Sequence, residues 1–362
     1  MIIKSLQLEK FRNYERTELE FNRKLNIFIG ENASGKTNLL ESVYFLGVGK
    51  SFKTARDKEL IKWGEETAYI KAVIEKKYRE HTLEMQIDEK GAKRILINKI
   101  PVTKLGELIG FLKVVLFSPE EMRFIKETPV ERRRFMDISL SQQNKNYYYT
   151  LVQYNKVLAQ RNRLLKDHYG SKSIENMLEI WDTELAKKAI IIAEKRENFL
   201  AELEQIANVK MLQLTENKEE IRLNYETKVD IKQENAIENF LKQLKDDREK
   251  DERLLYTNSG VHRDDMKVEV NGIDIRKYGS QGQQRSAALA LKLAEIDLFF
   301  NKTGEKPVLL LDDVLSELDL SRQNQLIDIA GKEQTILTAT HYQLNDKIEK
   351  TVFKVNNGNI KK

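Results

Sequence analysis

Two glycines, a lysine and a threonine near the N-terminus have the spacing of a phosphate-binding loop. Gly30 and Gly35 are separated by four residues, and Lys36 and Thr37 follow the second glycine. Such glycines allow successive backbone amides and a helix N-terminus to point at one phosphate chain. Lys36 would place a cation against the β- and γ-phosphates, and the Thr37 hydroxyl would bind Mg²⁺. We therefore expect a site for ATP and Mg²⁺, with Lys36 also acting in catalysis.

The nucleotide contacts expected from this P-loop extend from its first glycine into the next helix. They are Gly30, Glu31, Asn32, Ala33, Ser34, Gly35, Lys36, Thr37 and Asn38. An apolar strand pattern, Leu25–Ile29, precedes the loop, and a helix pattern follows it. The alternative interpretation is a glycine-rich turn before a core helix, and this strand and helix context makes it the weaker one.

Two carboxylates end a second apolar run. Pro307–Leu311 predicts a buried strand, and Asp312 and Asp313 follow it directly. Carboxylates at the end of a buried strand are costly unless a cation or hydrogen-bond donors meet them. We expect Asp312 to bind Mg²⁺ together with Thr37, and Asp313 to face the γ-phosphate and polarise a water molecule. The structural alternative is an acidic pair at a helix N-terminus.

A third group of polar residues precedes an Ala- and Leu-rich helix predicted over Ser286–Phe300. The group contains Ser280, Gly282 and Gln283. A hydroxyl and free amides at a helix N-terminus form an anion site. Because the P-loop already serves the phosphates of its own subunit, this second site would serve the nucleotide of a partner subunit. An ordinary serine-capped helix is the alternative.

Further strand patterns predict the elements that would position these groups. Alternating segments predict a hairpin before the P-loop, an antiparallel patch after it and a hairpin at the C-terminus, and continuous apolar runs predict buried strands. The segments are Ile2–Glu9 with Leu19–Phe21, then Tyr69–Glu75, Thr82–Ile87 and Arg94–Ile97, the buried runs Leu112–Phe117 and Gln334–Thr340, and Val352–Val355 with Asn359–Ile360. Together they predict an α/β fold with a mixed sheet and an antiparallel β patch.

Between residues 118 and 255 the pattern changes to the 3.6-residue period of helices. Ser118 and Pro119 are of the types expected at an N-cap and a first helical position. At 362 residues the chain exceeds the size at which one core usually stops growing. We therefore predict a discontinuous head, residues 1–117 and 256–362, with a mostly helical insertion at 118–255.

The composition excludes several classes of protein. The chain has no cysteine, which excludes a disulfide framework and a thiolate metal site. No run approaches the ~18 apolar residues that a membrane span needs, so we expect a cytoplasmic protein without a membrane partner. The net charge of +5 indicates nucleic acid only weakly, because charged residues make up 33% of the chain and mostly form solvated surface.

Basic residues concentrate between Arg123 and Lys166. Ten lysines and arginines stand against three acids there, and tyrosines lie among them. Basic side chains with aromatic ones suit contacts to a nucleic-acid backbone. The residues expected to bind DNA are Arg132, Arg133, Arg134, Lys145, Arg161 and Arg163. A solvated helix face is the alternative, since three successive arginines cannot share one face of a helix.

The order of these motifs resembles the ABC-type ATPase heads of the Rad50, SMC and RecF group. That order is the P-loop, Gly279–Gln283, the strand ending at Asp312 and Asp313, Ser316–Asp319, and Thr340–His341. The modest helical insertion is similar to RecF and not to the long coiled coils of SMC or Rad50. Other segments resemble RecF as well: Lys10–Tyr14, Gly49–Thr54, Val115–Glu120, Arg132–Asp137 and His262–Asp265.

The resemblance implies roles for individual residues. Ser280, Gly282 and Gln283 fall at signature positions that contact the partner's nucleotide, and Ser280 is also expected to act in catalysis. His341 falls at the position of the family's switch histidine. The resemblance implies that it senses the γ-phosphate, and we expect it to act in catalysis. Arg12 falls in a segment expected to contact the nucleotide.

The resemblance also implies a function. It implies a weak ATPase that dimerises on ATP, clamps duplex DNA near single-strand gaps and, with RecR and RecO, promotes RecA loading in DNA repair and replication restart. Asp313 stands where transporters have glutamate, and this shorter acid implies slow hydrolysis. Three alternatives use the same head. A structural DNA tether like SMC or Rad50 needs a long coiled coil, and a transporter ATPase subunit needs a membrane partner. An ATP-dependent nuclease needs an added metal-binding acidic cluster, which no segment outside the head clearly provides.

Overall fold

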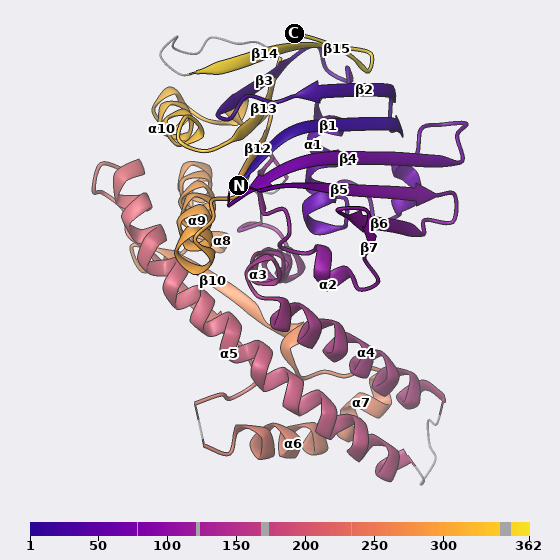
Figure 1. The fold of residues 1–362 in the computed structure, drawn as a ribbon. Coiled ribbons are helices and arrows are strands. Elements are labelled where there is room, and N and C mark those ends of the chain that lie inside the picture. Colours follow the sequence, from indigo (N-terminus) through magenta and orange to yellow (C-terminus); the bar gives the residue numbers. More distant parts are fainter. Residues whose placement is uncertain (78, 121–123, 168–173, 233, 341–348) are drawn as a thin grey trace. The chain divides into compact units, whose positions relative to one another are not determined.

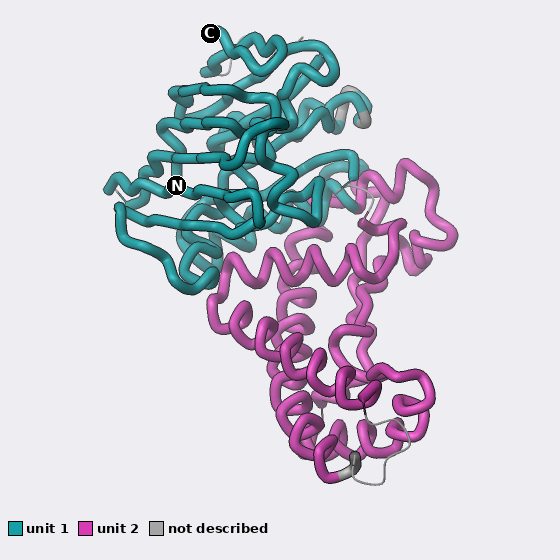
Figure 2. Tube along the Cα trace, turned by 90° about the vertical axis from the view of Figure 1, so that its right-hand side faces the viewer, with its two compact units in different colours: residues 1–123, 213–216, 288–362 teal, residues 124–212, 217–287 magenta. Residues whose placement is uncertain are grey.

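The computed structural model describes residues 1–77, 79–120, 124–167, 174–232, 234–340 and 349–362. The chain divides into two compact units, which Figure 2 shows in teal and magenta. Unit 1 comprises residues 1–123, 213–216 and 288–362, and unit 2 comprises residues 124–212 and 217–287.

Unit 1 contains a mostly parallel sheet that carries the P-loop (Figure 1). Its strand order is β15-β14-β3-β13-β12-β8, and the β14–β15 pair at one edge is antiparallel. The strands are β3 (Leu25–Ile29), β8 (Val114–Phe117), β12 (Val308–Asp312), β13 (Thr335–Ala339), β14 (Lys350–Asn356) and β15 (Asn359–Lys361). Every residue of β8, β12 and β13 is buried, as continuous apolar runs predict. Because β3, β12 and β13 are parallel, the segments that follow them leave the same edge of the sheet.

The second sheet of unit 1 is antiparallel, with the order β2-β1-β4-β5-β6-β7. Its strands are β1 (Ile2–Phe11), β2 (Tyr14–Glu20), β4 (Thr67–Lys76), β5 (Arg79–Asp88), β6 (Lys93–Ile97) and β7 (Ile100–Pro101). The P-loop helix α1 (Lys36–Val48) contacts strands of both sheets. Thr37 and Asn38 at its start are half-buried, and the rest of the helix is buried. The predicted combination of a mixed sheet and an antiparallel patch is confirmed.

The remaining elements of unit 1 are short, apart from two helices. They are η1 (Asp57–Leu60), α2 (Leu105–Leu108), η4 (Val314–Glu317), α10 (Leu320–Ala330) and the part of α9 (Gln281–Thr303) from residue 288 onward. The α9 helix begins five residues before the start predicted from its Ala- and Leu-rich stretch. Its polar first turn has no apolar pattern that would have marked it as helix.

Unit 2 is mostly helical and holds one small sheet. Its helices are α3 (Pro129–Gln143), α4 (Lys145–Asp167), α5 (Ile174–Leu214, up to residue 212), α6 (Ala236–Asp246), α7 (Arg248–Leu254), η3 (Val261–Arg263), α8 (Ile275–Tyr278) and the start of α9. The sheet has the order β11-β10-β9, with β9 (Ile221–Glu226), β10 (Asp265–Val270) and β11 (Ile273–Asp274), and is antiparallel.

Among the residues that the structure describes, the first helix after β8 begins at a different proline from the one expected. Pro119 and Glu120 lie in a turn, whereas α3 begins at Pro129 with Thr128 as its N-cap residue. Both prolines follow a residue with a hydroxyl group, so the local sequence does not show which of the two begins the helix.

Residues 256–287 lie in unit 2, although their strand pattern had placed them with the head. The reason is a pairing that a local pattern does not reveal. β10 pairs with β9 along six residues, and Arg132 of α3 forms a buried ion pair with Asp265 at the start of β10. β9 itself lies in the stretch expected to be helical, and only its short alternation of Ile221, Leu223 and Tyr225 signals a strand.

Candidate nucleotide-binding site

The P-loop joins β3 to α1 through two glycines whose positions leave no room for a side chain. A Cβ atom on Gly30 would lie 2.3 Å from the carbonyl oxygen of Val355 on β14. Gly35 is the N-cap residue of α1 and has a φ of 115°. A Cβ atom there would lie 2.5 Å from the side-chain nitrogen of Asn13. Close approach of neighbouring segments therefore requires both glycines of the motif.

Lys36 lies along the loop and is 6% exposed. Its ammonium group donates to the carbonyl oxygens of Gly30 (2.7 Å) and Glu31 (2.8 Å). Burial lowers the pKa of Lys36, and the carboxylates of Asp313 and Asp312 oppose that shift. The ammonium group is thus held at the loop by backbone oxygens, in the neighbourhood of two acids that the sequence places far away.

Ser34 provides the evidence that this loop is shaped for an anion. Its hydroxyl oxygen is buried and makes no hydrogen bond with any described residue. An unsatisfied buried polar group costs about 1–3 kcal/mol, and a phosphate oxygen would satisfy it. Together with the Lys36 ammonium group and the amides at the start of α1, this hydroxyl fits the phosphate chain of ATP. Glu31, Asn32 and Ala33 are exposed, and their nucleotide contacts stay a prediction.

The turn between β1 and β2 contacts the P-loop, which the residue types did not indicate. The Asn13 side-chain amide donates to the carbonyl oxygen of Ser34 (3.1 Å), and the Tyr14 hydroxyl donates to that of Gly35 (2.9 Å). Asn38, a predicted nucleotide contact, donates to the side-chain oxygen of Asn13 (2.9 Å). These bonds fix the second half of the loop. The segment Lys10–Tyr14 had been singled out by resemblance, and that was the one signal pointing to it.

Arg12 belongs to the same turn and has a left-handed backbone, with a φ of 52°. Its guanidinium group forms a bidentate ion pair with Glu41 of α1. Arg12 is therefore held beside the P-loop helix by a carboxylate that sequence patterns did not connect to it. Its contact with a nucleotide stays a prediction.

Asp312 and Thr37, the two predicted Mg²⁺ ligands, are brought together at the edge of the parallel sheet. Asp312 is 5% exposed and accepts hydrogen bonds from the Thr338 hydroxyl (2.9 Å) and from Thr37. Burial raises the pKa of Asp312, and these hydrogen bonds oppose the shift. Hydroxyl and carboxylate oxygens suit Mg²⁺, which usually takes its other ligands from phosphates and water. Among the described residues, no cluster of three or more His, Cys, Asp or Glu side chains could hold a metal ion by itself. Mg²⁺ at this site would therefore need ligands from phosphate and water.

Asp313 lies where β12 turns into η4 and has a left-handed backbone, with a φ of 51° and a ψ of 21°. Its amide donates to the hydroxyl oxygen (3.0 Å) and the carbonyl oxygen (3.3 Å) of Thr338. A non-glycine residue in this conformation costs about 1–2 kcal/mol, and such strain is concentrated at functional sites. Asp313 is also close enough to Lys36 to raise its pKa against the effect of burial.

The signature residues form the N-terminus of α9, in unit 2. The Gln283 amide donates to the Ser280 hydroxyl (3.2 Å), and the Ser280 amide donates to the Gln283 side-chain oxygen (3.0 Å). This reciprocal pair is a capping box. The Gln283 side-chain nitrogen also donates to Glu219 (3.0 Å). Ser280 and Gly282 are exposed. The fourth predicted catalytic residue, His341, lies outside the described residues.

For two of the six basic residues predicted to bind DNA, the prediction is wrong. Arg132 is 1% exposed and forms a bidentate ion pair with Asp265, at 2.6 and 2.9 Å. Arg161 is fully buried and is ion-paired with Asp182 (2.6 Å) and Asp251 (2.7 Å). Removing one partner from such a pair leaves an uncompensated buried charge, at a cost of about 3–5 kcal/mol. Both arginines are therefore structural.

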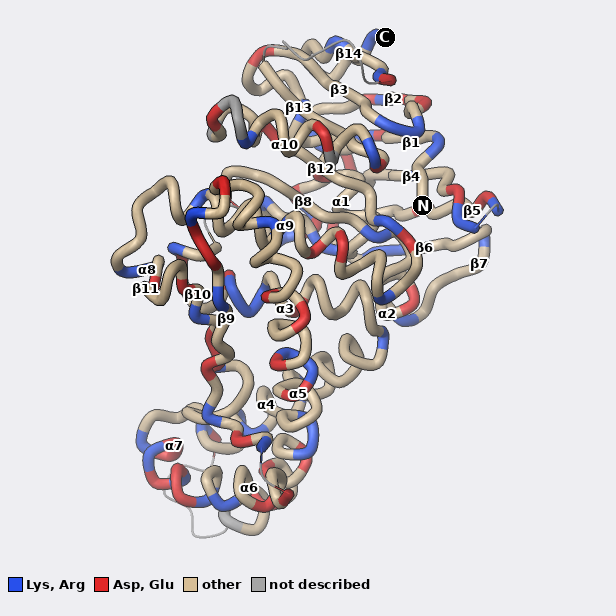
Figure 3. Tube along the Cα trace, turned by 90° about the vertical axis from the view of Figure 1, so that its left-hand side faces the viewer, with Lys and Arg blue, Asp and Glu red and all other residues tan. Residues whose placement is uncertain are grey.

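The other four basic residues differ in exposure. Lys145 and Arg163 are exposed, and Arg163 lies 3.2 Å from Asp167 on the same helix. Arg133 and Arg134 are half-buried; Arg133 donates to the carbonyl oxygen of Asp264. In Figure 3, basic and acidic positions are interspersed along the helices of unit 2. The local excess of basic residues in the sequence therefore does not correspond to six equally exposed side chains.

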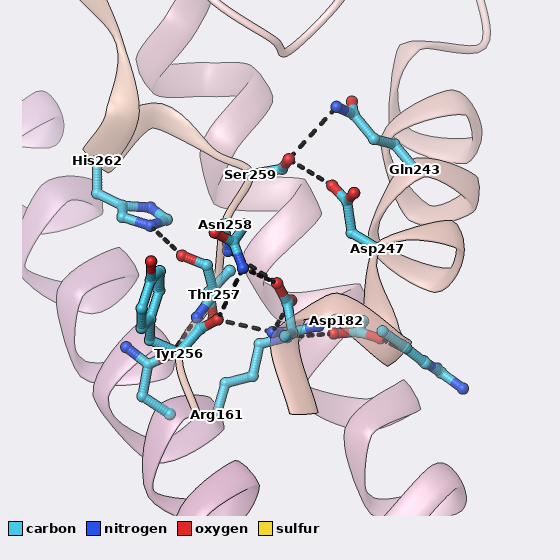
Figure 4. A network of polar contacts seen from close by, with 12 residues as sticks. Arg161, Asp182, Gln243, Asp247, Tyr256, Thr257, Asn258, Ser259 and His262 are labelled. Carbon is cyan, nitrogen blue, oxygen red and sulfur yellow. Dashed lines mark hydrogen bonds and ion pairs between the residues drawn. The ribbon is translucent and has the colours of Figure 1, made fainter. Parts of the chain in front are cut away.

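Arg161 is the centre of a polar network that joins α4, α5, α7 and the segment before η3 (Figure 4). Its guanidinium group donates to Asp182, Asp251 and the Thr257 hydroxyl (2.8 Å). At the far side of this network, the His262 ring lies with Nε2 3.0 Å from the Thr257 carbonyl oxygen. These contacts hold the segment 257–262 against the helices.

His262 is held in its neutral form. Its Nδ1 atom lies 2.7 Å from the Tyr154 hydroxyl. A neutral ring donates from Nε2 to Thr257 and accepts at Nδ1 from Tyr154. A second proton on Nδ1 would force the buried Tyr154 hydroxyl to give up its acceptor. Burial, the largest effect, lowers the pKa of His262 to about 4.

We expect His262 to make the stability of unit 2 depend on pH. In the unfolded chain the pKa of histidine is about 6.5, above the folded value of about 4. Stability is therefore full above about pH 6.5 and decreases as the pH falls toward 4, by roughly 2 kcal/mol after allowance for partial exposure. Urea unfolding between pH 4.5 and 7.5 measures this decrease. His262→Gln should flatten it and His81→Gln, in unit 1, should not; an unchanged slope in His262→Gln would contradict the assignment.

Comparison with known proteins agrees with this fold and site. The domain family described as RecF/RecN/SMC N terminal domain matches residues 2–361. A solved SMC head bound to the C-winged helix domain of ScpA has a TM-score of 0.58 over 100% of this chain and 96% of that chain, and its 17% identity shows a common fold only. Fold and nucleotide site together define an ABC-type ATPase head.

More similar proteins narrow this class to one family. The DNA replication and repair protein RecF of Alkaliphilus oremlandii is 43% identical, with 99% of this chain and 100% of the relative covered. RecF of Clostridium tetani is 44% identical over 99% of both chains. A solved structure of the recombination mediator protein RecF with ATP, in the RecFOR pathway, has 35% identity and a TM-score of 0.92 over 99% of this chain and 97% of that chain. The chain belongs to the RecF family.

Within the part of the chain that the structure describes, no helix is both long enough and apolar enough to cross a lipid bilayer. The relatives named above are RecF proteins and not transporter subunits.

Proposed function

We propose that this chain is an ATP-dependent DNA-binding recombination mediator, a weak cytoplasmic ATPase in which ATP acts as a dimerisation switch. The observation that carries the proposal is the P-loop, where a buried Ser34 hydroxyl, which has no hydrogen-bond partner among the described residues, lies beside a buried Lys36 ammonium group. A phosphate chain satisfies both groups. The 35% identity to a RecF structure solved with ATP supports the choice of nucleotide.

Mg²⁺ would be held by Thr37 and Asp312. Bound there, it would supply positive charge against the phosphate chain. Asp313 then orients and polarises the attacking water from the end of β12, and Lys36 binds the phosphate oxygens. His341 would sense the γ-phosphate, and the nucleotide contacts of Arg12 and residues 30–38 belong to the same proposal. Because Asp313 is shorter than glutamate, hydrolysis is slow.

The dimerisation step uses the start of α9. Ser280 and Gly282 are exposed there, and a helix N-terminus with a hydroxyl is an anion site. Two copies of the chain would close on two ATP molecules, each P-loop facing the Ser280, Gly282 and Gln283 of the other copy. In the closed dimer, the Ser280 hydroxyl and the Gln283 amide would turn from the capping box to the partner's γ-phosphate. Hydrolysis then opens the dimer.

The closed dimer would clamp duplex DNA next to a single-strand gap and, with RecR and RecO, promote RecA loading in DNA repair and replication restart. The name of the RecFOR pathway, given for a structural relative, supports RecR and RecO as partners. Of the predicted DNA contacts, Lys145 and Arg163 are exposed and can reach a phosphate backbone without breaking a buried ion pair.

Sedimentation of the purified chain tests this function. The mass is measured with ATP, with ADP and without nucleotide, each with and without a gapped duplex. We expect a dimer with ATP and a monomer with ADP or without nucleotide. Adding the gapped duplex to the ATP sample should strengthen the dimer. A monomer under all six conditions would contradict the ATP switch.

Ser280→Arg separates ATP binding from dimerisation. We expect the affinity for ATP to stay within about twofold, because the P-loop lies in unit 1, while the ATP-dependent dimer is lost because a long cation occupies the anion site. Loss of the cap should lower stability by about 1 kcal/mol. Ser280→Thr keeps the hydroxyl and should still dimerise. A Ser280→Arg chain that dimerises with ATP would show that the partner's nucleotide does not use this site.

A further inference from the structure

A fully buried carboxylate lies within the P-loop helix. Glu41, in the second turn of α1, has a side-chain exposure of 0%, and the residues on either side of it, Leu40 and Ser42, are buried as well. Taking a carboxylate out of water is expensive, and an apolar side chain of similar volume is often as stable or more stable at such a position. Packing alone therefore does not account for a glutamate here.

The partner of this carboxylate is Arg12, in the β1–β2 turn. Arg12 donates from Nε to Oε2 (2.8 Å) and from Nη2 to Oε1 (2.7 Å) of Glu41. This is the bidentate geometry in which a guanidinium group has one orientation. The Arg12 Nη1 atom donates to the carbonyl oxygen of Glu59 (2.8 Å). Two segments, α1 and the stretch that includes η1, therefore fix the direction of the guanidinium plane.

The orientation leaves part of the guanidinium group available. The contacts with described residues use three of its five N–H groups. The Arg12 side chain is 21% exposed, in contrast to Glu41. The next two residues, Asn13 of the turn and Tyr14 at the start of β2, donate hydrogen bonds to the P-loop carbonyls of Ser34 and Gly35. Arg12 thus presents unused donors from a turn that is bound to the loop itself.

The carboxylate is in turn held by Ser51, just after α1. The Ser51 hydroxyl donates to Oε1 of Glu41, and its oxygen accepts from the amides of Lys53 (2.9 Å) and Thr54 (3.0 Å). Because two amides occupy the acceptor side of this hydroxyl, its proton is directed at Glu41. The backbone of residues 51–54 therefore fixes the Ser51 hydroxyl, which fixes the Glu41 carboxylate. That carboxylate in turn fixes the Arg12 guanidinium group.

We propose that Glu41 is a positioning residue that aims the Arg12 guanidinium group at the phosphate chain of the bound nucleotide. The inference rests on the proposed ATP function and adds to it a residue that does not touch the nucleotide. An arginine that is oriented before binding loses less side-chain entropy when the ligand arrives, and it therefore contributes more to affinity. Without Glu41 the same arginine has to be ordered by the ligand.

Calorimetric titration with ATP and Mg²⁺ tests this inference, using Glu41→Gln, Arg12→Ala and the double variant. Glutamine keeps the volume of the glutamate side chain but removes the charge that holds the Arg12 guanidinium group. We therefore expect the affinity for ATP to fall about tenfold, the effect of one charge-assisted hydrogen bond. In the Arg12→Ala background the same substitution should cost less than about twofold, because its effect passes through Arg12. A merely structural role would instead give the same loss in both backgrounds.

Two further variants keep the test decisive. Glu305→Gln removes a carboxylate that pairs with Lys113 at 2.6 Å and is 10% exposed, also in unit 1, and it should leave the ATP affinity unchanged. If Glu41→Gln does not fold, Ser51→Ala loosens the same carboxylate and should weaken ATP binding about threefold, a smaller loss because the carboxylate keeps its charge and both of its bonds with Arg12. That loss should likewise disappear in the Arg12→Ala background.

The outcomes separate the inference from the function on which it rests. Failure of the wild-type chain to bind ATP would overturn both. ATP binding by the wild type with an unchanged affinity in folded Glu41→Gln, or with additive losses in the double variant, would overturn the positioning role alone. A tenfold loss that disappears without Arg12 would support it.

Discussion

Replacement of Lys36 by methionine is expected to weaken ATP binding by about 100- to 1,000-fold, since hydrogen bonds to charged groups contribute about 1.5–3 kcal/mol each. The ammonium group is buried and bonded to the carbonyl oxygens of Gly30 and Glu31, so it is already in place when the phosphates arrive. Methionine has nearly the same length and removes the charge. Calorimetric titration with ATP and Mg²⁺ measures the loss, and thermal unfolding shows whether the variant is folded.

A matched control exists at the other end of α1. The Lys93 ammonium group also donates to a backbone carbonyl, that of Gly49 (2.7 Å), and pairs with Asp57. Lys93 is the first residue of β6, so Lys93→Met removes a comparable lysine at the opposite end of α1 without altering the P-loop. We expect it to lower stability and to leave ATP affinity within about twofold, the usual result for a site with no shared partner. If both variants lost ATP binding equally, Lys36 would have no special role.

The second large effect is expected from Asp313→Asn. The rate of ATP hydrolysis should fall by about 100- to 10,000-fold, the range for loss of a positioned general base, while ATP still binds. Asparagine tolerates the left-handed backbone of this position, so the turn after β12 should be preserved. The ATP-bound dimer should then persist, and sedimentation after prolonged incubation with ATP would show it at times when the wild type has returned to monomer.

Asp328→Asn is a suitable control, because Asp328 is an exposed carboxylate on α10 in the same unit. It should hydrolyse ATP at the wild-type rate. Hydrolysis by Asp313→Asn at that same rate would remove Asp313 from the catalytic step and leave the P-loop as a binding site only.

Much of the head was predictable from local patterns. The strands of the parallel sheet are continuous apolar runs, and such a run is buried on both faces wherever it lies. The P-loop spacing predicted a turn with two glycines, and the neighbours of Gly30 and Gly35 leave no room for a side chain there. Asp312 was expected to join Thr37 because a P-loop needs a second acid for Mg²⁺. The parallel strands of the sheet, which end at the same edge, account for their meeting.

The sequence by itself therefore determined the class of fold and the position of the phosphate loop, since both depend on residues close together in the chain. The tertiary structure alone decided which charges are free. Arg132 and Arg161 look like surface cations in the sequence, but each meets carboxylates from distant segments and is buried with them. Contacts between Arg12 and Glu41, and between Asn13 and the P-loop, arise in the same way. Charge and hydrogen-bonding capacity belong to a residue type, whereas the partner that uses them is selected by the packing of remote elements.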